Sequence, residues 1–262
     1  MRTRLVALTL TMILIFPAVT NSQTPTATTQ AATILNQSLA AFGGSTTVSD
    51  ITLTGTAERI AGSDDETGTA TYKALSTANR LDLNLSGGSR SEIRGISSDG
   101  PTGTWIGPDG STHNIATQNL MSDPGFFPLF TLANLNSSAN NLFTYVGLES
   151  RNGASVIHLS GSQQFPTSPT TVAAFMQHLT RVEIYLDSKS FLPVSYLFTM
   201  HPDNDAGFDI PAEVRYSNYQ TIGGLQIPFH IQKLVNNTLV LDLQIQSASI
   251  NSGMTAAQLG AL

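Results

Sequence analysis

The sequence predicts a mainly β fold with a minor helical part: one antiparallel sheet of about ten to eleven strands that curls on itself. Three observations support this prediction. Segments that alternate apolar and polar residues recur through most of the chain, turn dipeptides separate them, and one helical segment precedes them. Such alternation makes one face of a sheet apolar and leaves the other polar and exposed to solvent, which is typical of antiparallel sheets.

The N-terminal segment, residues 1–22, has the order of a secretory signal peptide. Arg2 and Arg4 precede an apolar run from Leu5 to Phe16, and Pro17 ends that run before small and polar residues. The run is shorter than the roughly 20 residues that span a bilayer. We therefore expect a cleaved signal peptide, a flexible lead-in at residues 23–29 and a periplasmic or secreted mature protein.

A helix is predicted between Gln30 and Phe42. Its apolar residues Ile34, Leu35 and Leu39 fall at helical intervals, and Gly43-Gly44 follows where a left-handed cap ends a helix. This helix has one apolar face, so we expect it to pack on the sheet.

The strands follow the helix. Alternation is clearest in four segments: 80–86, 181–187, 225–231 and 239–245. Turn dipeptides stand between alternating segments, at Asp99-Gly100, Asp109-Gly110, Asn152-Gly153, Gly223-Gly224 and Asn236-Asn237. Because these residues accept the positive φ of hairpin turns, the strands are predicted to be joined mostly as a meander.

Two apolar insertions interrupt the strands, at residues 115–142 and 166–179. Prolines divide them, and their apolar residues lack alternation, so they predict short helical or irregular pieces. Residues 30–262 contain neither a repeat nor a charged linker and are predicted to form a single domain. One short helix cannot cover such a sheet, so the sheet must curl and the insertions must close its mouth. The enclosed space is either a ligand cavity or a core filled by the protein's own side chains.

Composition limits the function classes. The chain has 12 basic and 18 acidic residues, a net charge of −6, and 27 Ser with 32 Thr supply its polarity. A chain with this net charge lacks the cluster of basic residues that binds the phosphates of nucleic acids. It has no cysteine, which excludes disulfides, thiolate zinc sites and a lipid anchor on an N-terminal cysteine.

The common catalytic and cofactor motifs are missing. The sequence has no Gly-x-Ser-x-Gly elbow, no His-Glu-x-x-His and no phosphate-binding glycine loop, and its five histidines lack metal-ligand spacing. We therefore expect a non-catalytic protein without a cofactor. A Ser-His-Asp set assembled from distant residues would be the alternative, a hydrolase.

One acidic loop resembles a calcium site in part. Asp203, Asp205 and Asp209 alternate around Gly207, and calcium loops use such oxygen ligands with a glycine at the sharp turn. The distant Glu and a third early ligand of the complete pattern are absent. A solvated hairpin loop is the favoured interpretation of this segment.

Four local patterns, in order along the chain, resemble the LolA/LolB-like superfamily of periplasmic lipoprotein carriers. They are Ala41-Phe42-Gly43-Gly44 before the strand at 51–56, Ser98-Asp99-Gly100 with Trp105 and Pro108-Asp109-Gly110, Phe127-Pro128-Leu129-Phe130, and Tyr185 to Val194 followed by Ile210 to Tyr216. The chain departs from the family in lacking both the anchoring cysteine of the receptor type and a proline between Lys73 and Arg80.

This resemblance implies an unclosed β-barrel with helical lid segments that carries an acyl chain. The partners it implies are a lipid or lipoprotein acyl chain and a transient membrane or membrane-protein donor and acceptor. The alternative is a cell-envelope sensor or protein-interaction domain that uses the same half-barrel. The predicted ligand contacts are Met121, Phe126, Phe127 and Phe130 from the lid, and Leu81, Leu83, Leu85 and Trp105 from the sheet. Prolines and Gly125 predict a loosely held lid, and Phe127→Glu is expected to abolish uptake without unfolding the sheet.

Overall fold

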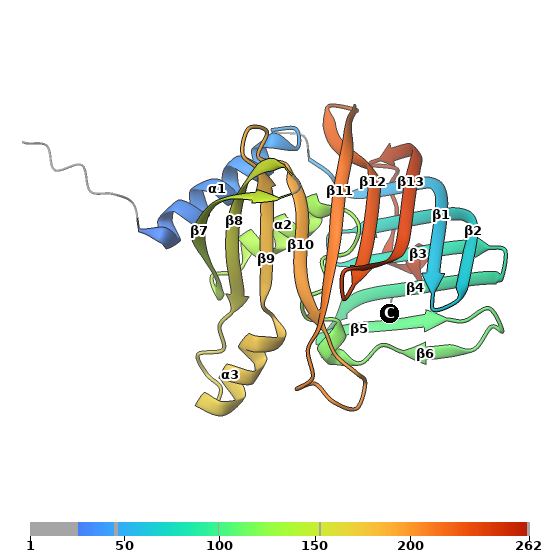
Figure 1. Cartoon of the computed structure of the whole chain (residues 1–262), viewed down its shortest axis with the longest axis horizontal. Helices are drawn as coiled ribbons and strands as arrows, with labels where there is room; N and C mark the ends of the chain where they lie inside the picture. The colour runs from blue at the N-terminus through green and yellow to red at the C-terminus, as the bar shows by residue number, and fades with distance from the viewer. Residues whose placement is uncertain (1–25, 45–46, 99, 152, 261–262) are drawn as a thin grey trace, which may run out of the picture.

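The computed structural model describes residues 26–44, 47–98, 100–151 and 153–260 (Figure 1). The predicted signal peptide lies outside these residues. Helix α1 (Ala27–Ala41) begins three residues earlier than the sequence predicts, because the Thr26 hydroxyl accepts a hydrogen bond from the Thr29 amide (3.2 Å) and caps the helix. Residues 27–29 are therefore helical and not a flexible lead-in.

The described residues contain thirteen strands in one antiparallel sheet. The first six are β1 (Asp50–Ala61), β2 (Asp64–Leu75), β3 (Ala78–Leu85), β4 (Gly88–Ser97), β5 (Gly100–Ile106) and β6 (Thr112–Asn114). The other seven are β7 (Asn141–Arg151), β8 (Ala154–Gln163), β9 (Val182–Asp187), β10 (Pro193–Met200), β11 (Ile210–Ile222), β12 (Leu225–Val235) and β13 (Thr238–Ile250).

The topology is two meanders joined edge to edge. Strands β1 to β6 and β7 to β13 each pair in sequence order, and β1 pairs with β13, so β6 and β7 form the two ends of the sheet. The predicted mainly β, curled and unclosed antiparallel sheet is confirmed. The strand count exceeds the prediction partly because β6, with three residues, is too short to show alternation.

Two of the predicted turns have the backbone that their residues favour. Asn236 and Asn237 have φ values of 49° and 60°, and Gly223 and Gly224 have φ values of 58° and 87°. Positive φ at both central residues is what a tight two-residue hairpin requires. Asp99 and Asn152 of two other predicted turns lie outside the described residues.

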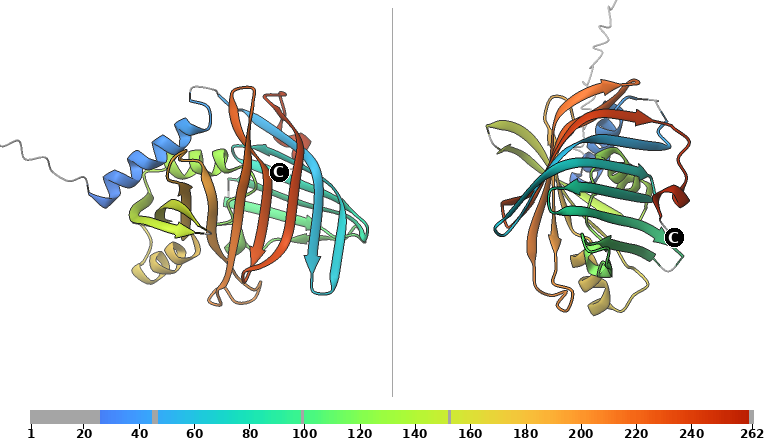
Figure 2. Two further views of the ribbon diagram at one scale, coloured as in Figure 1. Left: turned by 45° about the horizontal axis from the view of Figure 1, so that its top comes forward. Right: turned by 90° about the vertical axis from the view of Figure 1, so that its right-hand side faces the viewer.

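The sheet curls around α1 and α2 (Pro128–Ser137), which lie on its concave side (Figure 2). Ile34 and Leu35 of α1 and Phe130 and Leu132 of α2 are buried in the same apolar cluster as the concave faces of the strands. The middle of the half-barrel is therefore a filled core, as one of the two alternatives from the sequence expected.

The insertions form short helices, as predicted. The first contains the 3₁₀ turn η1 (Thr117–Asn119) and α2, which begins at Pro128 where a missing amide proton costs nothing. The second forms α3 (Thr170–Leu179), and a short α4 (Ala256–Leu259) follows the last strand. None of the helices in the described part of the chain is long and apolar enough to cross a membrane.

Candidate functional site

A cavity of about 380 Å³ lies between the two ends of the curled sheet. Ile96 and Thr102 of β4 and β5 line it from one end, and Phe143 and Val182 of β7 and β9 from the other. Its roof is the lid segment, defined here as residues 120–127, together with α2. The sheet does not close into a full barrel, so its two ends face each other across the cavity and form its walls.

Three of the four predicted lid contacts line this cavity. Met121, Phe127 and Phe130 are lining residues, and the Phe127 and Phe130 rings pack edge to face at 5.2 Å between centroids. Phe126 points elsewhere: its ring packs edge to face on Tyr72 at 5.6 Å, inside the core. The sequence does not show that Phe127 faces the cavity and Phe126 faces the core, because an irregular segment has no fixed period from which side-chain directions can be predicted.

The four predicted contacts from the sheet lie outside the cavity. Leu81, Leu83 and Leu85 are buried on the concave face of β3 within the core cluster. Trp105 is 44% exposed and stacks on His113 at 4.1 Å between ring centroids. The cavity gives no support to these four residues as ligand contacts, because lid and helix side chains already cover the apolar middle of the sheet.

Sequence reasoning missed the sheet residues that do line the cavity. Tyr72 and Ala74 reach it from β2, and Arg94 reaches it from β4. Tyr72 and Ala74 belong to an alternating segment, Thr69 to Ala74, so the pattern marks them as inward-facing. The pattern does not show which inward-facing residues remain uncovered by the lid.

The lid segment is tied down, and the prediction of a loosely held lid is wrong. Tyr216 donates a hydrogen bond to the Gly125 carbonyl (3.0 Å), and the Phe126 amide donates one to the Tyr72 hydroxyl (3.3 Å). Thr131 of α2 also donates to the Pro124 carbonyl. Gly125 has the positive φ expected of a turn, but these bonds fix the turn to the sheet.

A buried ion cluster holds the same segment. Asp123 of the lid contacts Lys233 of β12 (Nζ to Oδ2, 2.9 Å) and Arg94 of β4 (Nη2 to Oδ2, 3.1 Å). Arg94 also pairs with Glu92 (2.6 Å) and donates to the Asn119 carbonyl (3.0 Å). The side chains of Asp123, Arg94 and Lys233 are 5, 12 and 12% exposed, so these contacts are weakly screened.

The pKa values in this cluster follow from burial and charge. Burial alone would raise the pKa of Asp123, but the charges of Arg94 and Lys233 hold it well below its ordinary value. Burial alone would lower the pKa of Arg94, but the negative charges of Asp123 and Glu92 raise it above its ordinary value. Burial raises the pKa of Tyr72, which keeps its hydroxyl protonated. Asp123 is therefore a charged anchor for the lid, and the cavity has one polar wall.

A Ser-His-Asp contact exists, but on the opposite face of the sheet. Ser217 Oγ lies 3.2 Å from His230 Nδ1, and His230 Nε2 lies 2.9 Å from Asp242 Oδ2. Gln232 and Gln244 also donate to Asp242. These residues form a cross-strand ladder on β11, β12 and β13, on the face turned away from the core. The hydrolase alternative required the set to lie in the cavity, and it does not.

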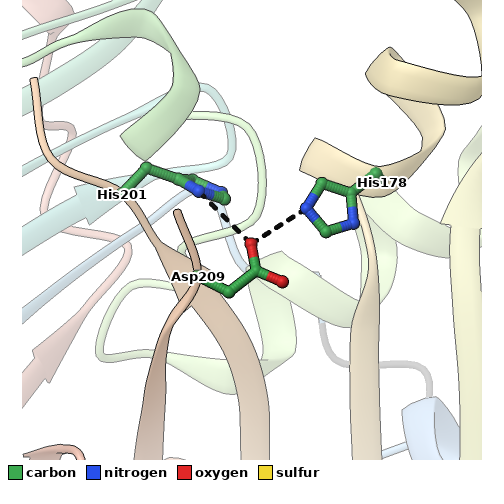
Figure 3. Close-up of side chains that lie close together, drawn as sticks. All are labelled: His178, His201 and Asp209. Atoms are coloured by element: carbon green, nitrogen blue, oxygen red, sulfur yellow. Dashed lines mark hydrogen bonds and ion pairs between the residues drawn. The ribbon is translucent and has the colours of Figure 1, made fainter. Parts of the chain in front are cut away.

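The acidic loop does not gather its three carboxylates. Asp205 accepts the Gly207 amide (3.0 Å), whereas Asp209 pairs with His178 (2.9 Å). Figure 3 shows Asp209 between His178 and His201. Among the described residues, these three side chains form a group that could hold a metal ion. The spacing of the histidines in the sequence does not predict this group, because tertiary contacts bring its three residues together.

Comparisons with known proteins identify the fold. No protein-family model and no curated protein matches the sequence. A domain described as an outer membrane lipoprotein-sorting protein from Vibrio parahaemolyticus is 13% identical, with 88% of this chain and 96% of that chain covered and a TM-score of 0.56.

Two further structures agree. A DUF1329 family protein from Desulfovibrio piger is 9% identical, covers 90% of this chain and 98% of its own, and has a TM-score of 0.58. A LolA superfamily protein from Nitrosomonas europaea is 12% identical, covers 87% and 96%, and has a TM-score of 0.51. At such identities the likeness concerns the fold alone, and it bears out the resemblance found in the sequence: the chain has a LolA-like fold.

Proposed function

We propose that this protein is an extracytoplasmic carrier that binds an acyl chain of a lipid or lipoprotein in the cavity, without catalysis. One observation carries the proposal: a mainly apolar cavity remains where the curled sheet fails to close, between the lid segment and the two ends of the sheet. The lipoprotein-sorting description of the Vibrio protein agrees with a carrier role.

The size and lining of the cavity suit part of an acyl chain. Its volume of about 380 Å³ lies at the lower end of the roughly 300–1,000 Å³ of small-molecule sites. Met121, Phe127, Phe130 and Phe143 supply apolar surface. Burying a methylene contributes about 0.8 kcal/mol, so ten methylenes contribute about 8 kcal/mol. The gain per methylene is about the same as in a membrane, so exchange of an acyl segment between the two would be close to balanced.

Loading and release require transient contact with a membrane or membrane-protein donor and acceptor. Displacing the lid segment would break the contacts of Asp123, Tyr72 and Tyr216. The two ends of the described sheet flank the cavity and do not pair with each other as strands. The acyl chain is therefore proposed to pass between the two ends of the sheet, with the lid in place.

A titration with a fluorescent fatty acid tests the proposal. Met121 is half-buried and lines the cavity, so Met121→Trp fills it with little strain on the core. We expect wild-type protein to bind the probe at one site and Met121→Trp to lose at least about tenfold in affinity, or about 1.4 kcal/mol.

The matched control is Met254→Trp. Met254 is also half-buried but lies after the last strand, away from the cavity. This variant should bind like the wild type. Equal binding by both variants, or no binding by the wild type, contradicts the carrier proposal.

A second function, docking of a protein partner, is favoured by the surface of β7. This strand ends the sheet, and Leu142, Val146 and Leu148 on it are 48, 52 and 64% exposed. Apolar side chains exposed together on the last strand of a sheet are typical of a protein-docking surface. Leu148→Lys would then abolish capture of a protein partner from the cell envelope and leave fatty acid binding unchanged.

A further inference from the structure

Three potential metal ligands meet at the end of α3. His178 lies in its last turn, His201 directly follows β10, and Asp209 directly precedes β11. Asp209 Oδ1 lies 2.9 Å from His178 Nε2 and 3.6 Å from His201 Nδ1 (Figure 3). One ligand atom of each residue lies within 4.8 Å of those of the other two.

Strand pairing fixes two of the three positions. Met200 and Ile210 are register partners in the β10–β11 pair, so the residues that follow and precede them stand together at the base of the connecting loop. Asn119 holds His201 further, because its side chain accepts from the His201 amide (2.7 Å) and donates to the His201 carbonyl (2.8 Å). Two ligands are therefore set in place by the backbone before any ion binds.

The imidazole of His201 is fully buried, yet only one of its nitrogens has a hydrogen-bond partner. Nδ1 lies 3.2 Å from the Phe208 carbonyl, on the side of Asp209, while Nε2 has no partner among the described residues. Because a carbonyl only accepts hydrogen bonds, Nδ1 carries the ring proton in this state; a metal ion at Nδ1 would replace that proton, and Nε2 would carry it instead. The contact with the Phe208 carbonyl keeps Nδ1 on the side of Asp209.

We propose that His178, His201 and Asp209 bind a zinc ion. Two imidazoles and one carboxylate are the donors that zinc takes, at about 2.0 to 2.2 Å. Tetrahedral ligands at that distance lie about 3.4 Å apart. The two spacings from Asp209, 2.9 and 3.6 Å, fall on either side of this value, and the ligand atoms of the two histidines lie within 4.8 Å of each other. The fourth position is left for water or a partner ligand.

The place of the site favours a cation and gives it a structural effect. His178 stands at the C-terminal end of α3, where the helix dipole is negative. Thr180, two residues further, lines the cavity, and Asn119, which holds His201, directly precedes the lid segment. Bound zinc would therefore tie the β9 wall of the cavity to its roof, and the site itself does not depend on what the cavity binds.

Calorimetric titration of the mature protein, free of any affinity tag, with zinc chloride tests the site. We expect one zinc per chain and a higher melting temperature at saturation. His178 and Asp209 are 41 and 49% exposed, so His178→Ala and Asp209→Ala should fold normally while weakening zinc binding at least about tenfold.

His113→Ala and Asp65→Ala are the matched controls, one exposed histidine and one exposed aspartate outside the group and outside the loop between His201 and Asp209. Both should bind zinc as the wild type does. The proposal is overturned if the wild type binds no zinc, if the two site variants bind it unchanged, or if calcium binds in preference to zinc.

Discussion

Asp123 is the residue on which the roof of the cavity depends. It reaches from the lid segment to Arg94 on β4 and Lys233 on β12, and so joins the two meanders beneath the lid. Its other oxygen accepts the Gly125 amide (3.0 Å). A buried charge in a low dielectric needs such partners, and removing one partner leaves the others uncompensated.

We therefore expect Asp123→Asn to lower the free energy of unfolding by about 3–5 kcal/mol, because Arg94 and Lys233 remain charged and buried. Urea unfolding measures this change. Asp203→Asn removes an exposed aspartate of the same charge and should change stability by no more than about 0.5 kcal/mol. Equal effects of the two substitutions would contradict the account of the cluster.

Phe127 illustrates how a residue's neighbours change a prediction made from sequence. It lines the cavity, but it is 2% exposed and its ring also packs against Phe42 and Phe130. A glutamate there would bury a charge without a partner, so Phe127→Glu should unfold the protein, contrary to the sequence-based expectation. Met121, half-buried at the cavity wall, is the position where ligand binding and folding can be separated.

At the scale of elements, the strands and helices were largely predictable, and the lid's attachment was not. Alternation marked β3, β9, β12 and β13 because each has one buried face. The sequence places the start of α1 three residues too late. The helix begins at a threonine cap in a segment rich in threonine, and this segment has no apolar residues at helical spacing to mark it. The ties of the lid join residues as far as 110 positions apart, which no local pattern records.

The lid segment offers a test with a matched pair of tyrosines. Tyr216 donates to the Gly125 carbonyl, whereas the buried hydroxyl of Tyr196 has no partner in the described part of the chain. Tyr216→Phe should cost about 1–2 kcal/mol and speed amide hydrogen exchange at Phe126, because a buried carbonyl loses its donor. Tyr196→Phe should leave both quantities unchanged or slightly raise stability. A larger loss in Tyr196→Phe would refute the assignment of the lid anchor.

The segment after β13 is held by Asp50 at the start of β1. Its carboxylate accepts from the Ser252 amide and hydroxyl (2.8 and 2.7 Å) and from the Gly253 amide (3.0 Å). Burial alone would raise the pKa of Asp50, but these hydrogen bonds and that of Ser49 lower it from 3.8 to about 2. A lowered folded-state pKa stabilises the folded form above pH 3.8, and this contribution is lost as the pH falls through about 2.

Hydrogen exchange at Gly253 and Met254 should therefore stay slow down to about pH 4, once corrected for intrinsic rates, and quicken toward pH 2. Asp50→Asn should give faster exchange that no longer changes over this range. If wild-type exchange shows no change between pH 4 and pH 2, Asp50 does not anchor this segment.

At the scale of the whole molecule, the sequence left one question open: whether the curled sheet is hollow or filled. The structure answers in two parts: α1, Phe126 and α2 pack the middle of the sheet, and a cavity remains where the ends of the sheet approach. Which inward-facing residues border that cavity depends on how the lid lies across the strands. This explains why Met121 was found from the sequence and Ala74 was not.

The same reasoning applies to His178, His201 and Asp209. Their place on α3 and at the base of the β10–β11 loop follows from the pairing of the two strands and from the position of the helix. The sequence shows only that His201 and Asp209 border one loop. The third residue is brought there by tertiary packing.

Native mass spectrometry of the protein purified from its own cells tests the carrier account most directly. We expect the wild type to carry a bound mass that tandem fragmentation assigns to a lipid or acylated peptide, and Met121→Trp to lose it while Met254→Trp retains it. Bare wild-type protein, or a bound mass that all three proteins retain equally, would contradict a role for the cavity in carrying an acyl chain.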